Sequence, residues 1–361
     1  MKIQPTEKKV RALKKVMLFT VALLALASAA IAGCGGSNTT PASSSTGGSV
    51  AAAPKLSQFC GTDCQSALAL KADPASIDCT VGLSWNSFGH PYGAATGKLT
   101  QAAQKELFPN MKLLVSDGGG DSTVQSNGVD DMVAKGVKVI IISPNDAKAL
   151  APAVDRATKA GVKVIASDRN VATTVSSYIG AENIDTGTVA GEYAVKVLGG
   201  KGNIVELQGS LGASPTIDRH KGFADAIAGT PGLKVIASPN ADYNREKGRK
   251  VMEDMLQRFG KGKIQAVFTH NDEMSLGAIQ AIKEAGRQDE IQVIGIDGQQ
   301  SALEAIKAGQ YSGSVVYPID SPEHLVAAAK LCAGETIPER IKMTATLVTK
   351  DNVADIDGKT F

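Results

Sequence analysis

The chain has 361 residues, of which 43% are hydrophobic and 20% charged, and its 38 basic side chains nearly balance its 36 acidic ones. Without residues 1–33 the balance is 32 basic against 35 acidic residues, so the slight positive charge belongs to the N-terminus. This excludes the strongly basic surface of proteins that bind nucleic acids. The length beyond residue 33 indicates two domains.

Residues 1–33 predict a signal peptide. Basic residues between Lys8 and Lys15 precede an apolar run at 16–32, which is close to the shortest length that spans a membrane. An uncleaved signal anchor is therefore the alternative. The segment 31–34 (IAGC) resembles the bacterial lipobox, in which the cysteine is lipidated before cleavage. We expect Cys34 to anchor the protein on the extracytoplasmic side of the membrane, followed by a flexible Gly/Ser/Thr tether.

The other four cysteines are Cys60, Cys64, Cys79 and Cys332. An even number in an oxidising compartment is compatible with two disulfides, and four cysteines allow three connectivities. Buried free thiols are the alternative. Cys60 and Cys64 lack the second pair of ligands that a zinc site would need.

From residue 77 onward, short Val/Ile-rich runs alternate with segments of helical periodicity. The runs that predict strands are residues 78–85, 112–119, 137–144, 162–169, 202–209, 233–240, 264–271 and 291–298. Segments 147–161 and 275–286 carry apolar residues three and four positions apart and end at glycine. Continuous apolar strands are typical of parallel sheets covered on both faces. The pattern predicts an α/β protein with two doubly wound units in tandem.

Motifs for nucleotide phosphates are absent from the sequence. G-x-x-x-x-G-K-[ST] does not occur, and no G-x-G-x-x-G follows a predicted strand. H-E-x-x-H and G-x-S-x-G are missing as well. A nucleotide-dependent enzyme is disfavoured, and we expect neither a cofactor nor catalysis.

Polar and aromatic side chains gather where the predicted strands end, which is where open α/β sheets bind ligands. In chain order they are Trp85, Asn86, His90, Pro91, Tyr92, Ser143, Asn145, Asp168, Arg169, Gln208, Tyr243, Asn271, Asp272, Glu273 and Asp297, with Arg219 at a helix start. Carboxylates, amides and guanidinium groups bond hydroxyls, and aromatic faces cover the C–H faces of a ring. The set is typical of a site for a neutral polyhydroxylated ligand.

Each of these residues also has a purely structural interpretation. Asp168 and Arg169 could neutralise each other, and Asn271 could cap the helix that begins near Glu273. Taken together at successive strand ends, the residues favour binding. A metal site at His270 is disfavoured, because successive strand residues point to opposite faces and so do not converge. We expect His270 to pack against the sheet, with Asp272 and Glu273 supporting the helix start.

Several segments together resemble one known family, the type I periplasmic sugar-binding proteins of ABC importers, ribose-binding-like. The segments are HPYG (90–93), ISPND (142–146), ASDRN (166–170), the block 206–227, ADYNREKG (241–248), HNDEMSLGAIQAIKEAG (270–286) and IGIDG (294–298). The resemblance covers residues 77–350, and the block 206–227 is most similar to the galactofuranose-binding branch. It implies two Rossmann-like lobes, joined by three hinge strands, that close on one monosaccharide.

The resemblance also implies a set of ligand contacts. Carried over position by position, they fall on Asp168, Arg169, Arg219, Tyr243, Asn271, Asp297 and Tyr92. Four positions depart from the ribose-type pattern: His90 and Ser143 stand where asparagine is usual, Gly93 replaces an aromatic residue and Tyr317 replaces a hinge glutamine. We keep His90, Ser143 and Tyr317 as ligand candidates. The departures leave a sugar or sugar-like ligand as the expectation without identifying which sugar.

The family topology implies an N-terminal lobe of residues 77–181 with 318–345 and a C-terminal lobe of residues 182–317 with 346–361. Before them lie the signal peptide (1–33) and a tether with an N-terminal extension (34–76). In that layout Cys79 opens the first strand and Cys332 ends a helix that returns from the hinge. This implies the pairs Cys79–Cys332 and Cys60–Cys64.

The resemblance implies a monomeric, extracytoplasmic lipoprotein that captures a monosaccharide and delivers it to an ABC permease in the membrane. A receptor for a sugar or furanose-like signal, which presents its ligand to a membrane sensor, has the same fold and is the alternative. A third hypothesis is an extracytoplasmic enzyme that uses Asp168 and Asp297 as paired carboxylates.

Overall fold

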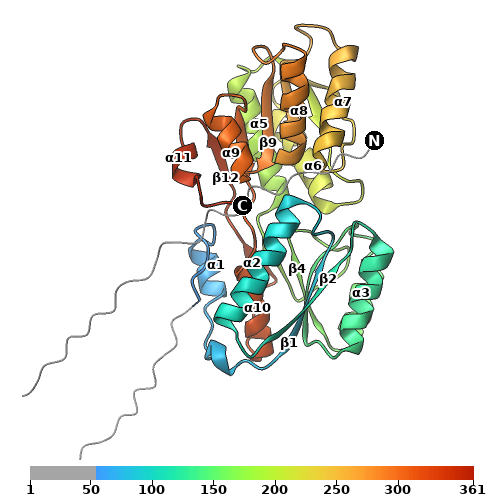
Figure 1. Ribbon diagram of the computed structural model, residues 1–361, viewed down its shortest axis with the longest axis vertical. Coiled ribbons are helices and arrows are strands. Elements are labelled where there is room, and N and C mark those ends of the chain that lie inside the picture. Colours follow the sequence, from blue (N-terminus) through green and yellow to red (C-terminus); the bar gives the residue numbers. More distant parts are fainter. Residues whose placement is uncertain (1–53) are drawn as a thin grey trace, which may run out of the picture. The chain divides into compact units, whose positions relative to one another are not determined.

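The computed structural model describes residues 54–361, so the expected signal peptide, Cys34 and the first part of the tether lie outside the described residues. The chain forms two six-stranded sheets, each with its own helices (Figure 1). Sheet A comprises β11 (Arg340–Lys342), β5 (Ser177–Gly180), β4 (Lys163–Ser167), β3 (Val139–Ser143), β1 (Thr80–Trp85) and β2 (Lys112–Asp117), in spatial order. Sheet B comprises β12 (Thr346–Thr349), β10 (Gly313–Val316), β9 (Gln292–Asp297), β8 (Ala266–Thr269), β6 (Gly202–Leu207) and β7 (Leu233–Ala237).

The predicted α/β fold with two doubly wound sheets is confirmed. All eight predicted runs contain a strand, and every pairing in sheet A is parallel. Sheet B is parallel except for its edge pair β10–β12. All five residues of β3 are buried, as expected of a central strand with helices on both faces.

Helices lie in most of the connections between the strands, with α1 before β1 and α11 after β12. Around sheet A they are α1 (Thr62–Ala67), α2 (Pro91–Leu107), α3 (Ser122–Ala134), α4 (Ala151–Lys159) and α10 (Glu323–Cys332), with a 3-10 turn at Pro74–Ser76. Around sheet B they are α5 (Asn183–Val197), α6 (Ser214–Ala228), α7 (Arg245–Arg258), α8 (Asp272–Glu284), α9 (Gln300–Lys307) and α11 (Val353–Ile356). Asp121 is an example of an N-cap that fixes where a helix begins. Its carboxylate accepts hydrogen bonds from the amides of Thr123 and Val124 at the start of α3.

The chain passes between the sheets three times. It leaves sheet A after β5, returns from β10 to β11, and crosses again from β11 to β12. This is the three-strand connection that the resemblance implied. The exact lobe boundaries, 77–181 with 318–345 and 182–317 with 346–361, stay a prediction.

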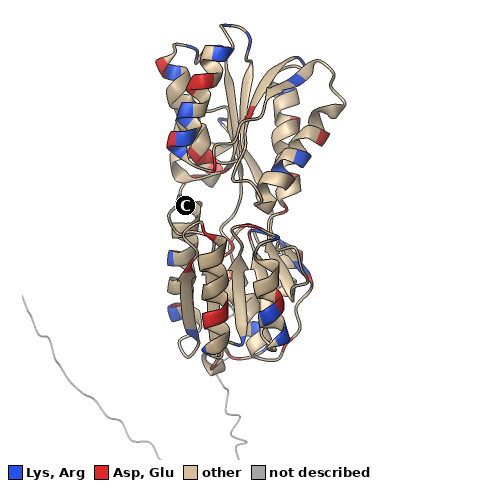
Figure 2. Ribbon diagram, turned by 90° about the vertical axis from the view of Figure 1, so that its right-hand side faces the viewer, with Lys and Arg blue, Asp and Glu red and all other residues tan. Residues whose placement is uncertain are grey.

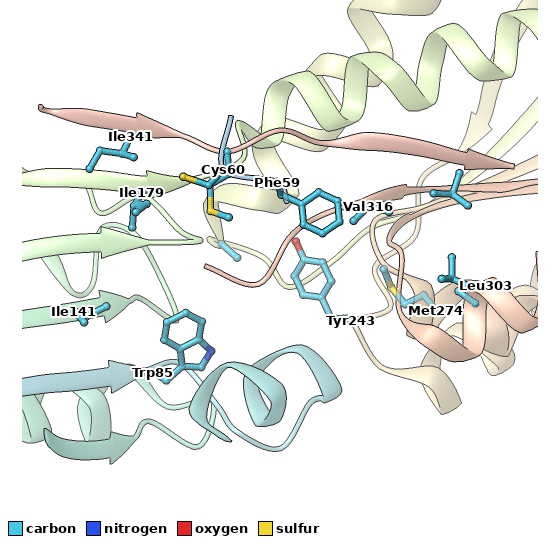
Figure 3. Packing of buried hydrophobic residues seen from close by; sticks show 14 of the residues in the cluster. Phe59, Cys60, Trp85, Ile141, Ile179, Tyr243, Met274, Leu303, Val316 and Ile341 are labelled. Carbon is cyan, nitrogen blue, oxygen red and sulfur yellow. The ribbon is translucent and has the colours of Figure 1, made fainter. Parts of the chain in front are cut away.

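The largest hydrophobic cluster draws on both lobes. It includes Trp85 at the end of β1 and, from the other lobe, Tyr243 and Met274 (Figure 3). Trp85 is 1% exposed and Tyr243 7%. Burying a large apolar side chain is worth roughly 1.5–3 kcal/mol, so this cluster stabilises the fold.

The outer surface carries both signs of charge. In the view of Figure 2, basic and acidic residues are interspersed along the helices of both lobes. Several of them form exposed ion pairs, such as Arg156 with Asp130 at 2.8 Å. Within residues 54–361, no helix combines the length and the apolar character that a membrane crossing requires.

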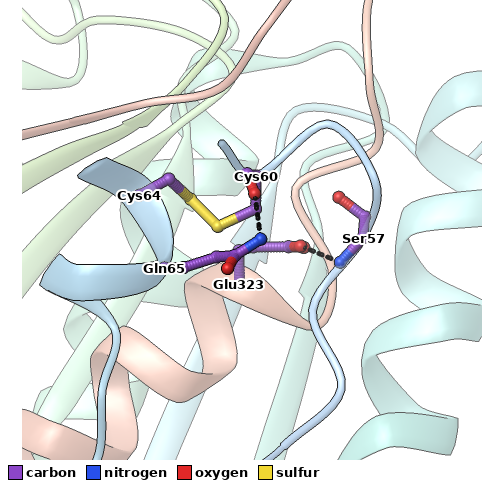
Figure 4. The surroundings of a disulfide bond; sticks show 5 residues. All are labelled: Ser57, Cys60, Cys64, Gln65 and Glu323. Carbon is purple, nitrogen blue, oxygen red and sulfur yellow. Dashed lines mark hydrogen bonds between the residues drawn. A yellow bond between two sulfur atoms is a disulfide. The ribbon is translucent and has the colours of Figure 1, made fainter. Parts of the chain in front are cut away.

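Two disulfides join the four described cysteines. Cys60 is bonded to Cys64, which closes the loop before α1, and Cys79 at the edge of β1 is bonded to Cys332 at the end of α10. Figure 4 shows the first disulfide beside Glu323, whose carboxylate accepts from the Ser57 amide. The N-terminal extension is thereby fastened to the lobe of sheet A.

The two disulfides are expected to differ in their effect on stability. Cys79–Cys332 closes a separation of 253 residues and Cys60–Cys64 one of 4. Constraint of the unfolded chain grows with loop length, from roughly 2 kcal/mol for the short loop to about 5 for the long one. Urea unfolding of the C79S/C332S and C60S/C64S double variants should therefore show the larger loss for C79S/C332S. Equal losses, or free thiols at Cys79 and Cys332 in non-reducing peptide maps, would contradict this pairing.

Candidate ligand-binding site

A cavity lies where the carboxyl ends of both sheets face each other. Its lining residues are Trp85, Asn86, Ser87, His90, Tyr92, Gly93, Asp168 and Arg169 from the sheet A side, and Pro215, Arg219, Tyr243, Asn271, Asp297 and Tyr317 from the sheet B side and its connections. The empty space amounts to about 460 Å³ including its opening to solvent.

Nine of the ten predicted ligand residues line this cavity: His90, Tyr92, Asp168, Arg169, Arg219, Tyr243, Asn271, Asp297 and Tyr317. Ser143 does not. Its hydroxyl accepts from Asn86 Nδ2 at 3.0 Å and donates to Asp168 Oδ2 at 2.9 Å, so it stands behind Asp168 and orients that carboxylate. Ser87 and Pro215 were not among the strand-end residues, because Ser87 lies two positions beyond β1 and Pro215 belongs to the first turn of α6.

Asp168 and Arg169 form the charged part of the sheet A side. Arg169 Nε lies 3.5 Å from Asp168 Oδ2, longer than the 2.7–2.9 Å of a charge-assisted hydrogen bond. Arg169 Nη1 donates to the carbonyls of Pro144 and Asn145 at 3.4 and 3.3 Å, whereas Nε is buried without a hydrogen-bond partner among the described residues. The pair thus keeps donor and acceptor capacity for a ligand.

Arg219 and Asp297 form the corresponding pair on the sheet B side. Arg219 Nη1 lies 3.6 Å from Asp297 Oδ1 and donates to the His270 carbonyl. Arg219 reaches this position because α5 and α6 pack closely. A Cβ placed on Gly187 of α5 would lie 2.3 Å from the Arg219 carbonyl oxygen, so only glycine permits this approach.

Burial raises the pKa of both cavity carboxyls. The pKa of Asp168 is raised by burial, against the opposing charges of Arg169 and Arg219. Burial raises the pKa of Asp297 well above its ordinary value, and Arg219 only partly offsets this. Hydroxyl groups of a ligand that donate to these oxygens would stabilise the charged carboxylates, because hydrogen bonds to the charged form favour it.

Three cavity residues have a backbone conformation that side chains rarely adopt. Asp168 has φ of 66°, Tyr243 of 57° and Asp297 of 127°, and the only other non-glycine residue with positive φ in residues 54–361 is Asp242. Such conformations cost on the order of 1–3 kcal/mol each and persist only where their surroundings hold them. Their concentration around one cavity is typical of a functional site.

Aromatic rings form the walls of the cavity. The rings of Tyr92 and Tyr317 lie 5.7 Å apart, and the guanidinium carbon of Arg219 lies 5.0 Å from the Tyr317 ring. The Tyr317 hydroxyl donates to the backbone, so this residue contributes a ring face. Gly93 has no room for the aromatic residue of the ribose-type pattern, since a Cβ would lie 2.1 Å from the Ser87 carbonyl oxygen.

The four residues of the segment 270–273 have different surroundings. Asn271 lines the cavity, but its Oδ1 also accepts from the Met274 amide at 3.0 Å and caps α8. Both interpretations of Asn271, ligand contact and helix cap, are therefore open to the same side chain. Fully buried His270 bonds through Nε2 to Glu206 at 2.8 Å, and Asp272 accepts from Tyr311 and Ser314 inside the lobe.

Direct contacts between the lobes close one side of the cavity. The Ala147 amide donates to the Gly212 carbonyl at 3.3 Å, and the Asn170 amide donates to Ser214 Oγ at 2.9 Å. Asn170 directly follows Arg169 and Ser214 directly precedes Pro215, so this second contact adjoins the lining of the cavity. Within residues 54–361, no three His, Cys, Asp or Glu side chains gather as a metal ion would require.

A two-lobed α/β protein whose strand ends enclose a polar cavity is built as a binding protein. The family model described as the periplasmic binding protein domain matches residues 81–329. The chain therefore belongs to the periplasmic binding protein family, whose type I members share this fold.

Several relatives of the chain are named as sugar-binding proteins. It is similar to the ribose import binding protein of Bacillus subtilis, with 37% identity covering 65% of this chain and 75% of the relative. It is similar to the galactofuranose-binding protein of Escherichia coli, with 35% identity covering 76% of this chain and 89% of the relative. The solved fructose-binding periplasmic domain of a hybrid two-component system has a TM-score of 0.73 and 30% identity, covering 77% of this chain and 93% of that one.

One buried histidine next to the site predicts an acid-sensitive fold. His324 is bonded to Thr100 and to Ser167, whose hydroxyl also donates to Asp320, and burial lowers the pKa of His324 to about 3. In the unfolded chain His324 is protonated below about pH 6.5, whereas in the folded protein it stays neutral down to about pH 3. The free energy of unfolding should therefore fall as the pH drops from 6.5 towards 3. The contribution is about 1.4 kcal/mol per pH unit.

Urea unfolding of wild type and the H324N variant between pH 4 and 6 measures this contribution. In the variant, the free energy of unfolding should depend on pH less steeply than in the wild type, by about 1.4 kcal/mol per pH unit. The same pH slope in both proteins would show that His324 is not held neutral by its burial.

Proposed function

We propose that the protein is an extracytoplasmic binding protein that captures a monosaccharide between its two lobes and delivers it to an ABC importer. One observation carries the proposal: a cation–carboxylate pair from each lobe, Asp168 with Arg169 and Arg219 with Asp297, faces one cavity with aromatic walls.

This arrangement suits a ring that carries several hydroxyl groups. Each hydroxyl can donate to a carboxylate while accepting from a guanidinium, and ring faces can cover the C–H surface. A ligand that contacts both pairs at once binds the closed arrangement better than an open one. Its differential affinity then drives hinge closure, since a ligand shifts a conformational equilibrium only by such a difference.

Four residues favour a sugar other than ribose itself as the ligand. The chain is about equally similar to a ribose-binding and to a galactofuranose-binding protein. It differs from the ribose-type pattern at His90, Gly93, Ser143 and Tyr317, all of them in or directly behind the cavity. The burial of His90 and the nearby charge of Arg169 lower its pKa, so a neutral imidazole would meet the ligand.

The proposal includes a lipid anchor, a monomeric state and a permease partner in the membrane. A lipid on Cys34 would anchor it through the tether and N-terminal extension of residues 34–76. A monomer would present its closed form to the permease. The same chain would function without a cofactor, a metal or a nucleic acid.

A signal receptor is the second candidate function. The similarity to the fructose-binding domain of a hybrid two-component system favours it, because that domain has the same fold and comparable identity. The two functions differ in the membrane partner. Co-purification with a permease and ATPase supports import, whereas co-purification with a sensor kinase supports signalling.

The ligand site is tested by removing its charged residues singly. Calorimetry with D-ribose, D-fructose and methyl β-D-galactofuranoside first identifies which sugar the wild type binds. Asp168→Ala and Arg169→Ala should each weaken that affinity by more than tenfold, because a hydrogen bond to a charged group is worth about 1.5–3 kcal/mol. Arg156→Ala is the matched control, since it breaks an exposed ion pair with Asp130 in the same lobe.

Unchanged affinity in both site variants would refute the assignment of Asp168 and Arg169. A comparable loss in Arg156→Ala would show that the effect is not specific to the cavity. Turnover of a glycoside by the purified protein would instead favour the enzyme hypothesis, with Asp168 and Asp297 as its carboxylates.

A further inference from the structure

The backbone carbonyl of Asp168 lies within hydrogen-bond distance of three buried side chains. Tyr178 Oη lies 3.2 Å from it and 3.0 Å from the Ala181 carbonyl, and Tyr317 Oη lies 3.0 Å and 3.2 Å from the same two oxygens. Asn183 Nδ2 donates to the Asp168 carbonyl at 3.1 Å. Tyr178 and Asn183 are each 2% exposed, and Tyr317 is 1% exposed. A tyrosine hydroxyl has one proton, so the two tyrosines together serve the carbonyls of Asp168 and Ala181, and Asn183 adds a further donor to Asp168.

These donors hold a residue whose conformation needs support. Asp168 follows β4 directly and has φ of 66°, in the left-handed region that costs energy for a residue with a Cβ. Its amide donates to the Ile179 carbonyl at 3.2 Å. With amide and carbonyl both held, the direction of the Asp168 side chain is set, and that side chain lines the cavity.

Asn183 makes a second contact that reaches the opposite half of the site. Its Oδ1 accepts from Arg219 Nε at 2.8 Å, while its Nδ2 serves the Asp168 carbonyl. Asn183 is the first residue of α5, directly after the first passage between the sheets. One buried amide therefore connects a charged cavity residue of each lobe, although Asn183 itself does not line the cavity.

Tyr178 is fixed from its other side by an ion pair. The guanidinium carbon of Arg340 lies 4.4 Å from the Tyr178 ring, and Arg340 donates from Nε and Nη2 to Glu182 at 2.9 and 2.8 Å. Glu182 directly precedes Asn183. The contacts thus run without interruption from the surface of the hinge to the Asp168 carbonyl.

We propose that Tyr178 and Asn183 are positioning residues that set the geometry of the ligand site from behind. Tyr178 holds the conformation of Asp168, and Asn183 keeps Asp168 and Arg219 in register across the lobe boundary. The inference rests on the proposed function for its effect on sugar affinity, but the positioning itself can be measured without any sugar.

The variants are Tyr178→Phe, which removes one hydroxyl, and Asn183→Leu, which keeps the size of the side chain and removes both polar ends. Tyr193→Phe is the matched control. Tyr193 lies on α5 and its hydroxyl also donates to a backbone carbonyl, that of Ser312 at 2.7 Å, away from the cavity. If Asn183→Leu does not fold, Tyr178→Phe decides the outcome with its control.

The first measurement is hydrogen–deuterium exchange in the ligand-free protein. Amides of residues 166–171 should exchange about tenfold faster in Tyr178→Phe than in wild type, since one buried hydrogen bond is lost. Tyr193→Phe should leave this segment unchanged. A purely structural role for Tyr178 would lower the melting temperature of both phenylalanine variants alike and leave the exchange of 166–171 equal in the two.

The second measurement is the affinity for whichever of D-ribose, D-fructose and methyl β-D-galactofuranoside binds the wild type. Tyr178→Phe should weaken it by about tenfold and Tyr193→Phe by less than about twofold. Equal exchange and equal affinity in Tyr178→Phe and Tyr193→Phe would overturn the proposal. If none of the three sugars binds the wild type, the proposed sugar function fails, and the exchange measurement alone decides whether Tyr178 positions Asp168.

Discussion

Three buried charged side chains and a fourth that is partly exposed lie where the two lobes meet. Asp168, Arg219 and Asp297 are 6%, 3% and 6% exposed, and Arg169 lies beside them with a buried Nε. Removing charges from water costs several kcal/mol per ion unless partners and hydrogen bonds compensate. Each lobe supplies part of that compensation: Ser143 and Arg169 lie against the Asp168 carboxylate. Asn183 and Asp297 lie against the Arg219 guanidinium.

The fold is arranged so that these charges can be brought together. Parallel strands direct their carboxyl ends to one edge, and two such sheets facing each other place Asp168 after β4 and Asp297 at the end of β9. Glycine at position 187 lets α6 approach α5 closely enough for Arg219 to reach the same space. The unusual backbone at Asp168 and Asp297 aims the carboxylates into the cavity rather than along the strands. A ligand with many hydroxyl groups would offset the energetic cost of these features by forming hydrogen bonds with the buried charged groups.

The sequence predicted eight of the twelve strands and missed the last two at the end of each sheet that adjoins the passages between the lobes. Strands such as β3, with five buried residues in a row, stand out as apolar runs between turns. The four strands that were not predicted, β5, β10, β11 and β12, have three or four residues each and lie at sheet edges or beside the passages between lobes. Their assignment depends on pairing with distant segments, as β11 pairs with β5 across more than 150 residues.

A similar limit applies to the candidate site. Residues that follow strands, such as Asp168 and Asn271, could be proposed from position and chemistry alone. The supporting residues could not, because Tyr178 and Asn183 are polar side chains whose role exists only once the lobes adjoin. Ser143 shows the opposite case, since its position after β3 suggested ligand contact while its hydroxyl is used by Asn86 and Asp168.

The central claim is that a monosaccharide binds between the lobes, and the chain contains one tryptophan, Trp85, which lines that cavity. Its emission therefore reports on this site without a label. Titration with the sugar that calorimetry identifies should change Trp85 fluorescence saturably, with the same dissociation constant and one site per chain. Binding that calorimetry detects while Trp85 emission stays constant would contradict the account, because the sugar would then occupy another part of the protein.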